Sequence, residues 1–509
     1  MRKTIIILLV IFPLSLQVSA QADAQKASSE SNPQDLEKIY GVGLPRDIDR
    51  LAPETNSYPE WQTTQYQAVD STRLKKVVED LSAFALEDKV INKYWGRLPG
   101  TEADKKTMAY IAANLKQLGY QLSARKTLIP KEWKPIDWSL SYRVNGKQYN
   151  LKTAFPSGSG MRKSSNVQGE AVWLGLGSEA DFKGRDVSGK VAIIYSMFVP
   201  GGRSHSASNR SKLFYANKRA SQQGASLIVN IMGVPGNAQF MPAPHYLTRG
   251  KVIKPLKVPV VTISQDDGFA IRDDIAANDV EVTYQSEWLK QKNVEANYLI
   301  AELKGKSSED VIIAAHTDGY FEGALDNASG VAVTLEMAHH YATQKEPPDR
   351  TIKLFFFSDH HHGEFTRREF EEAHNWDNVA LVITVEHPSQ TQLYWYNDGL
   401  MTSNAIGAFR WNVSGSEQLK STILDSFKQN GISTYTMMDP NPKFTKQAPS
   451  FHIIDHVIYH TTLDIPELVP VEGMKRATKS FLNIVDKTNE MTLAELRSVK
   501  SSTTSKQGK

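Results

Sequence analysis

Val311-Ile312-Ile313-Ala314-Ala315 leads directly into His316, and two later apolar runs end in the same way. Residues 352–357 precede Asp359-His360-His361-His362, and residues 380–385 precede Glu386-His387. A shorter run, residues 456–459, ends at His460. Continuous apolar runs are typical of strands buried in a parallel sheet, and such sheets place their chemistry at the carboxyl ends of strands. We therefore predict an α/β fold with a metal centre at one sheet edge.

The composition is that of a globular protein, with 40% hydrophobic and 23% charged residues in 509. This length predicts more than one domain. The formal charge of +3 falls to +1 if Arg2 and Lys3 are removed with the first twenty residues, so neither nucleic acid nor an acidic membrane is expected as a partner. The chain has no cysteine, which excludes disulfides and thiolate ligands. Any metal must be held by His, Asp and Glu.

The amino terminus predicts export. Arg2 and Lys3 precede an apolar stretch over residues 5–16, and Val18-Ser19-Ala20 offers a small-residue cleavage site. We interpret residues 1-20 as a secretory signal peptide, with an uncleaved anchor as the alternative. No later segment approaches the roughly 20 apolar residues that a spanning helix needs. The prediction is a secreted or periplasmic protein that does not contact the membrane after cleavage.

The rest of the chain divides by its patterns. Residues 21-71 are polar and irregular, and apolar residues recur at helix spacing from residue 72. Thr101 and Asp104 suggest a capping box for a second helix that ends at Gly119. Residues 165-288 alternate strand-like runs with turns and form a separate module that carries no ligand cluster. We expect this module to be inserted between two parts of one catalytic-type domain, residues 72-164 and 289-496, with further helices over 331–341 and 471–496. Residues 497-509 are expected to be a disordered tail.

His316 is a good candidate ligand because a carboxylate two residues away, Asp318, can fix its second ring nitrogen. Asp326 lies in Gly323-Ala324-Leu325-Asp326-Asn327-Ala328-Ser329-Gly330, directly before a helical run. The small residues there allow close backbone packing, and Asp326 is placed to bridge two cations. On periodicity alone, an ordinary helix-capping role for Asp326 is the commoner interpretation.

Three adjacent histidines are usually a solvated tract, but His360, His361 and His362 follow a strand too apolar to be exposed. Successive side chains at a strand end diverge, so one or two of the three can face a metal while the others handle protons or face solvent. Glu386 and His460 complete the set of candidate ligands.

Other polar residues near the last of these motifs are weaker candidates. His452 and His456 are placed to line the site. Tyr459 is a candidate for donating a hydrogen bond to a reacting oxygen, with a simple packing role as the alternative.

The order of these motifs resembles the co-catalytic zinc aminopeptidases, whose relatives include bacterial leucyl aminopeptidase, plasma glutamate carboxypeptidase and prostate-specific membrane antigen. The similarity covers about residues 72–490, and its most specific parts are the Asp326 motif and Tyr459-His460-Thr461 followed by Asp464. The module over 165-288 resembles the protease-associated domain of that family. The resemblance implies a mostly parallel central sheet flanked by helices, a β-rich insert, one or two zinc ions or another divalent first-row metal, and a peptide or small amide substrate.

Carried over by position, the resemblance implies that His316 and Asp326 hold one ion, and that Asp326, Glu386 and His460 hold the other. The family has two adjacent glutamates before the glycine, of which the first is a general base and the second a ligand. This chain has His360 and His361 there, and Glu386 where aspartate is usual. His361 can still bind zinc alongside His316 and Asp326. Losing a general base commonly costs on the order of 10² to 10⁴ in rate.

Three hypotheses follow. The leading one is a secreted metal-dependent hydrolase of amide or peptide bonds, of the aminopeptidase or carboxypeptidase type, with His360 and Asp318 acting beside the metal. The second is a binding protein without catalytic activity on a metallopeptidase scaffold. The third is a single-metal lyase, cyclase or transferase on the same fold.

Overall fold

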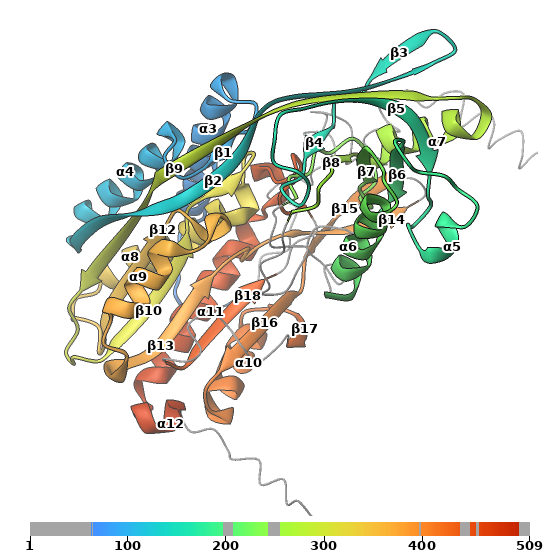
Figure 1. The fold of residues 1–509 in the computed structure, drawn as a ribbon. Coiled ribbons are helices and arrows are strands. Elements are labelled where there is room, and N and C mark those ends of the chain that lie inside the picture. Colours follow the sequence, from blue (N-terminus) through green and yellow to red (C-terminus); the bar gives the residue numbers. More distant parts are fainter. Residues whose placement is uncertain are drawn as a thin grey trace, which may run out of the picture.

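The computed structural model describes Thr63 and residues 65–196, 207–242, 255–396, 399–437, 448–454 and 458–497. The predicted signal peptide, nearly all of the lead-in and the tail from residue 498 lie outside these ranges. Within them, one large twisted sheet runs through the molecule and carries helices on both faces (Figure 1). Among the described residues, no helix is long and apolar enough to cross a membrane.

The centre of this sheet is β10 (Asp310–His316), which pairs in parallel with β12 (Thr351–Phe357) and β13 (Val379–Val385). On the far side of β13, β18 (Ser450–Ile454) extends the parallel set. Every residue of β10 and β13 is buried, as expected for apolar runs covered on both faces. The carboxyl ends of all four strands therefore share one sheet edge. The predicted α/β architecture is confirmed, although the complete sheet is mixed.

Alternate residues of β10 face two separate apolar layers. Val311, Ile313 and Ala315 belong to the layer that holds α3 (Ser71–Ile91), α8 (Gly330–Ala342) and α11 (Val471–Asn489). Ile312 and Ala314 face α9 (Phe365–Ala373), where Phe370 stacks on Phe355 with 4.2 Å between ring centroids. This burial on both faces fixes the register of β10 and so the position of His316 at its end.

Helix boundaries follow local capping chemistry. Before α4 (Glu102–Gln117), Thr101 Oγ1 accepts from the Asp104 amide at 3.2 Å, but the Asp104 carboxylate accepts from Gly100 N, so only half of the expected capping box forms. The single helix predicted over 471–496 is wrong, because α11 ends at Asn489 and α12 (Leu493–Arg497) follows. Thr492 and Glu495 cap each other reciprocally at 2.8 and 3.3 Å and begin the new helix.

Two very long strands join the halves of the molecule. β2 (Gln121–Val144) and β9 (Glu281–Leu303) pair antiparallel along almost their whole length. One end of β9 pairs with β12 and the other with β5 (Ser165–Trp173), the first strand of the predicted insert (Figure 1). The boundary expected between residues 288 and 289 therefore lies inside a continuous strand.

In the predicted insert the large sheet continues from β5 through the parallel strands β6 (Val191–Tyr195), β7 (Leu227–Ile231) and β8 (Val260–Ile263). Its helices are α5 (Glu179–Phe182), α6 (Ala207–Gln222) and α7 (Gln265–Ala277). The other described elements are β1 (Gly96–Arg97), β3 (Lys147–Asn150), β4 (Phe155–Pro156), β11 (Gly319–Tyr320), β14 (Thr391–Tyr396), β15 (Gly399–Ile406), β16 (Phe409–Ser414), α10 (Glu417–Gln429) and β17 (Thr434–Met437).

The insert also contacts the loop that carries His460. Gln239 and Thr462 exchange two hydrogen bonds of 3.1 Å, and Phe240 forms an isolated bridge with Thr461. The amide of Met241 donates to the carbonyl of His460 at 2.9 Å. The insert therefore supports the edge of the catalytic-type half where the candidate ligands lie.

Candidate metal centre

Asp326 lies at the middle of a buried cluster of imidazoles. Its Oδ1 is 3.1 Å from His316 Nε2 and 3.0 Å from His387 Nε2. Its Oδ2 is 3.2 Å from His361 Nε2 and 3.1 Å from His460 Nε2. All of these side chains are almost completely buried. The structure thus brings His316, Asp326, His361 and His460 together from four separate segments.

Main-chain hydrogen bonds hold Asp326 in place. The Asp464 carboxylate accepts from the amides of Leu325 and Asp326 at 2.5 and 3.0 Å. Asn327 donates to the carbonyls of His316 and Val385 at 3.2 and 2.9 Å, which ties the ends of β10 and β13 to the turn that carries Asp326. Asp326 therefore does not act as the ordinary helix cap that periodicity favoured.

The three consecutive histidines diverge as expected for a strand end, in a short turn over His360–His362. The Asp318 carboxylate accepts from the amides of His360 and His361 at 3.1 and 2.9 Å, and its Oδ1 lies 3.3 Å from His316 Nδ1. His361 Nε2 reaches Asp326 Oδ2 at 3.2 Å. His362 turns away and pairs with Glu132 of β2. Asp318 thus orients two segments of the centre, the end of β10 and the turn over His360–His362.

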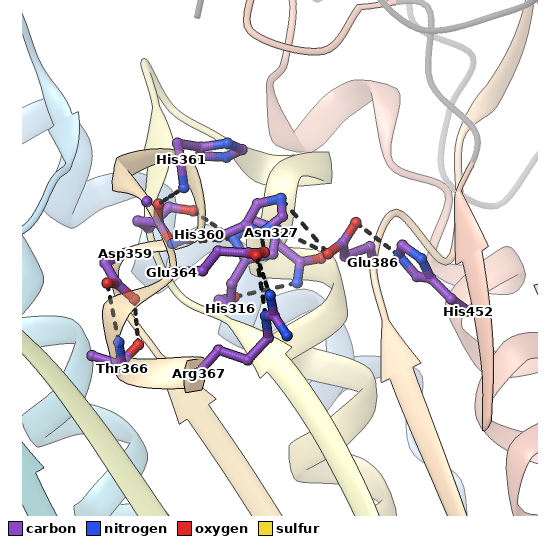
Figure 2. Close-up of polar contacts among 12 residues, drawn as sticks. His316, Asn327, Asp359, His360, His361, Glu364, Thr366, Arg367, Glu386 and His452 are labelled. Atoms are coloured by element: carbon purple, nitrogen blue, oxygen red, sulfur yellow. Dashed lines mark hydrogen bonds and ion pairs between the residues drawn. The ribbon is translucent and has the colours of Figure 1, made fainter. Parts of the chain in front are cut away.

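His360 stacks on His316 with 4.2 Å between ring centroids, so it lies beside the centre (Figure 2). Its Nδ1 is 2.9 Å from Glu364 Oε1, and the other oxygen of Glu364 pairs with Arg367 at 2.7 Å. His360 Nε2 lies 3.8 Å from Glu386 Oε1. His360 is therefore held by a carboxylate on one side and faces a second carboxylate on the other.

The end of β13 supplies two polar residues. Glu386 Oε2 is 2.8 Å from His452 Nε2 on β18, and Glu386 Oε1 is 4.0 Å from His316 Nε2 (Figure 2). His387 was not among the predicted ligands, although it directly follows Glu386 and its Nε2 contacts Asp326. A second metal-type residue after an apolar run was the signal in the sequence that could have identified it.

Among the described residues, three sets of side chains place potential ligand atoms within 4.8 Å of one another. They are Asp326 with His361 and His460, His316 with Glu386 and His387, and His316 with His360 and His361. His361 therefore shares one group with His460 and another with His316. Glu386 belongs with His316, on the opposite side from His460.

The donor atoms fit a metal ion. His460 Nδ1 lies 3.3 Å from the Met241 carbonyl, and His316 Nδ1 lies 3.0 Å from the Asp318 carbonyl. Because a carbonyl only accepts, the proton of each neutral ring is on Nδ1, and each Nε2 directs a lone pair towards Asp326. Among the described residues, Asp326 Oδ2 accepts no hydrogen bond, despite two imidazole nitrogens within 3.2 Å. A divalent cation between these atoms would satisfy the carboxylate and both imidazoles.

Burial and local charge set the protonation of the cluster. Burial lowers the pKa of His460 to about 3, and the charge of His361 acts in the same direction, so the His460 ring is neutral at physiological pH. Burial opposes charge on His316, but its hydrogen bonds to Asp318 and Asp326 outweigh this effect and raise its pKa to about 10. Without a metal, His316 is therefore protonated beside Asp326 Oδ1 at neutral pH, and a cation bound there would replace the proton on Nε2. Nitrogen and oxygen donors without sulfur suit Zn²⁺ and similar divalent ions.

A buried arginine lies beneath the centre. Arg97 is completely buried and donates to the carbonyls of Leu81, Thr317, Glu322 and Gly323, with distances of 2.6 to 3.3 Å. Burial lowers its pKa to about 10, which leaves it charged at neutral pH. Burial and the charge of Asp326 raise the pKa of Asp464 to about 8.

The remaining candidates have mixed positions. The Tyr459 ring packs on His460 with 3.8 Å between centroids, and Tyr320 packs on the same imidazole at 4.6 Å. His452 lies in the site through its contact with Glu386. His456 falls outside the described residues.

Comparison with known proteins agrees with this geometry. Residues 298–485 match the model of Peptidase family M28. The chain is 24% identical over 388 residues to Aminopeptidase YwaD of Bacillus subtilis (strain 168), which covers 72% of this chain and 76% of that protein. It is 30% identical over 137 residues to a probable lipoprotein aminopeptidase, LpqL of Mycobacterium tuberculosis, which covers 26% of each chain.

Solved structures share the fold. A Peptidase M28 precursor from Shewanella amazonensis superposes with a TM-score of 0.61 and 18% identity, over 84% of this chain and 99% of that one. BSAP, a zinc aminopeptidase from Bacillus subtilis, gives a TM-score of 0.57 and 18% identity, over 84% and 98% of the two chains. The match over residues 298–485 and the alignment with the aminopeptidase support a metallo-exopeptidase-like hydrolase, and the solved structures share its fold. The ligand cluster lies within residues 298–485, the segment that matches the M28 model.

Proposed function

We propose that this protein is a secreted, zinc-dependent aminopeptidase-type hydrolase that removes residues from peptides or cleaves small aminoacyl amides. One observation carries the proposal. At the carboxyl ends of the parallel strands, the Nε2 atoms of His316, His361 and His460 all lie within 3.2 Å of the Asp326 carboxylate. That edge lies inside the segment matched by the M28 model. The relative that aligns over most of the chain is named an aminopeptidase, which favours the amino end of a substrate.

When bound, the metal would polarise the scissile carbonyl and lower the pKa of a water molecule. The residues of the chain then have to position the substrate and move the proton. We propose that His360 Nε2 accepts the proton that the attacking water releases. Glu364 accepts the Nδ1 proton of the same ring at 2.9 Å, so Nε2 is left as an acceptor in the neutral tautomer. Asp318 holds the backbone of His360 and His361 in register for this task.

We propose export on the sequence pattern alone. Arg2, Lys3 and the apolar run over residues 5–16 precede the small-residue site at Ala20, a pattern typical of a cleaved signal peptide. Expression of the full chain with mass analysis of the mature amino terminus tests this proposal. We expect a mature chain that starts at residue 21 in the periplasm or the medium. Recovery of an intact chain from the membrane fraction contradicts it.

Activity is tested with the purified chain after reconstitution with zinc. The substrate panel contains free and amino-blocked aminoacyl anilides, dipeptides and carboxyl-terminal amides. We expect hydrolysis of substrates with a free amino terminus, loss of turnover with a chelator, and near-complete loss in His361→Ala. Turnover that persists without metal contradicts the proposal.

The replacement of both family glutamates by His360 and His361 favours a second candidate, a binding protein on the same scaffold. It predicts metal at full occupancy with no turnover on the whole panel. Isothermal titration calorimetry with the same peptides then shows whether the protein binds peptides.

A further inference from the structure

Four imidazoles surround Asp326 in two matched pairs. His316 and His387 lie 3.1 and 3.0 Å from Oδ1, and His361 and His460 lie 3.2 and 3.1 Å from Oδ2. A carboxylate with two imidazoles at each oxygen has the layout of a bridge between two cations. From this layout we infer that His387, and not the acid before it, is the metal ligand at the end of β13. This inference rests on the proposed metal centre but not on the substrate or the reaction.

The contact distances of His387 and Glu386 can be compared with the spacing expected between two ligands of one ion. Two atoms bound to one zinc-sized ion at about 2.0–2.1 Å lie roughly 3.3 Å apart in a tetrahedral site. The contact of 3.0 Å between His387 Nε2 and Asp326 Oδ1 is close to that spacing. Glu386 Oε1 is 4.0 Å from His316 Nε2, which is longer than that tetrahedral spacing. His387 therefore lies at first-sphere spacing beside Asp326, whereas Glu386 lies in the same group of side chains but farther from His316 than this spacing.

Local structure supports the two different roles. His387 has φ of 50°, a left-handed conformation that residues other than glycine rarely adopt. Its amide donates to Asn327 Oδ1 at 3.3 Å, so the residue beside Asp326 holds this backbone. The His387 side chain is only 2% exposed. Glu386 is held by His452 at 2.8 Å on the adjacent strand, with its other oxygen near His360.

The inference has a consequence for the choice of metal. Two imidazoles and a shared carboxylate oxygen at each position make a nitrogen-rich centre. Imidazole suits zinc, cobalt, nickel and copper, whereas magnesium and calcium prefer carboxylate, carbonyl and water ligands. We expect two borderline first-row ions for each chain and no stable occupation by magnesium or calcium.

The experiment measures metal content, so it does not depend on turnover. The full-length mature chain is stripped with a chelator and reloaded with Zn²⁺ or Co²⁺. Elemental analysis then gives ions per chain, and visible absorption reports the cobalt coordination. We expect two ions in the unchanged chain and one in His387→Ala, with loss of part of the cobalt absorption. Glu386→Gln should keep two ions. His374→Ala is the matched control, because His374 is a mostly buried histidine that lies 3.5 Å from Asp310 at the opposite end of β10.

A second variant separates a ligand from a hydrogen-bond donor. His387→Gln keeps a side chain able to donate to Asp326, and it perturbs the fold less than alanine. We expect it to hold one ion as well. Two ions in His387→Gln or His387→Ala, one ion in Glu386→Gln, or fewer than two in the unchanged chain would overturn the inference. Two ions with no hydrolysis of any substrate would overturn the proposed function and leave the inference standing.

Discussion

At the scale of single residues, the centre depends on side chains that position the ligands as much as on the ligands themselves. Asp318 is completely buried and touches His316, His360 and His361. Groups that orient metal-binding histidines commonly change metal affinity by 10-fold to 100-fold. The residue two positions after His316 is therefore as important for the centre as the histidine itself.

We expect Asp318→Asn to weaken zinc binding by about 10-fold to 100-fold, because an amide cannot accept from two backbone amides through two oxygens. Competition with a chromophoric chelator measures this affinity. Asp349→Asn is the control, since Asp349 forms an exposed pair with Lys306 and is 60% exposed. Equal affinities of Asp318→Asn and the unchanged chain would show that Asp318 does not orient the ligands.

Asp104 predicts a pH dependence of stability. Burial raises its pKa to about 7, against 3.8 for the ordinary carboxyl, although Asn297 and Gly100 donate to it. A raised pKa means that the folded state binds more protons than the unfolded state, so stability falls as pH rises from about 4 to 7. Between pH 5 and 8 the free energy of unfolding should drop by about 2 kcal/mol more in the unchanged chain than in Asp104→Asn. Urea unfolding of both proteins at the two pH values tests this, and parallel pH profiles contradict it.

At the scale of elements, the metal centre is built where loops leave four parallel strands, and Arg97 fastens one of these loops to its neighbours. Its guanidinium binds carbonyls from α3 and from the segment between β10 and Asp326. A Cβ on Gly319 or Gly323 would lie 2.8 or 3.0 Å from this guanidinium. The glycines therefore leave room for the arginine that organises the loop.

We expect Arg97→Met to lower the free energy of unfolding by about 3 kcal/mol or more, because it leaves several buried carbonyls without donors. Chemical denaturation measures the change. Arg125→Met is the control, since Arg125 is exposed and donates to Ser123 on the surface. Equal losses of unfolding free energy in both variants would show that the hydrogen bonds from Arg97 to the buried carbonyls do not stabilise the fold.

At the scale of the whole molecule, the centre connects parts that are distant in the chain. Its side chains come from the ends of β10, β12 and β13, from the turn before α8 and from the loop at His460. That loop also contacts the insert through Gln239 and Met241. A bound ion should therefore stabilise both halves of the molecule together.

Zinc at about 1,000 times its Kd should add about 4 kcal/mol to the free energy of unfolding, because it binds the folded state only. Differential scanning calorimetry of the stripped and reloaded chain measures this. We expect a smaller shift in His460→Ala, which lacks one ligand and the contact with Met241. A thermal transition that is the same with and without zinc would show that no ion links these segments.

The sequence was sufficient for the α/β fold and for the edge at which the polar side chains gather, because buried parallel strands are continuous apolar runs and their ends are marked by polar residues. It did not predict the long β2 and β9 pair, whose alternating polar pattern reads as two ordinary surface segments. It also placed no helix at α9 or α10, and it did not include His387 among the candidate ligands.

His316, the Asp326 turn, the histidines after β12 and His460 could thus be chosen from local pattern alone, since each follows an apolar run or lies in a glycine-rich turn. Which imidazole faces which oxygen of Asp326 was decided only by tertiary structure. Backbone angles such as the positive φ of His387, and partners such as His452 and Met241, come from distant segments. Side-chain direction at a strand end depends on these partners, and a linear pattern carries no information about them.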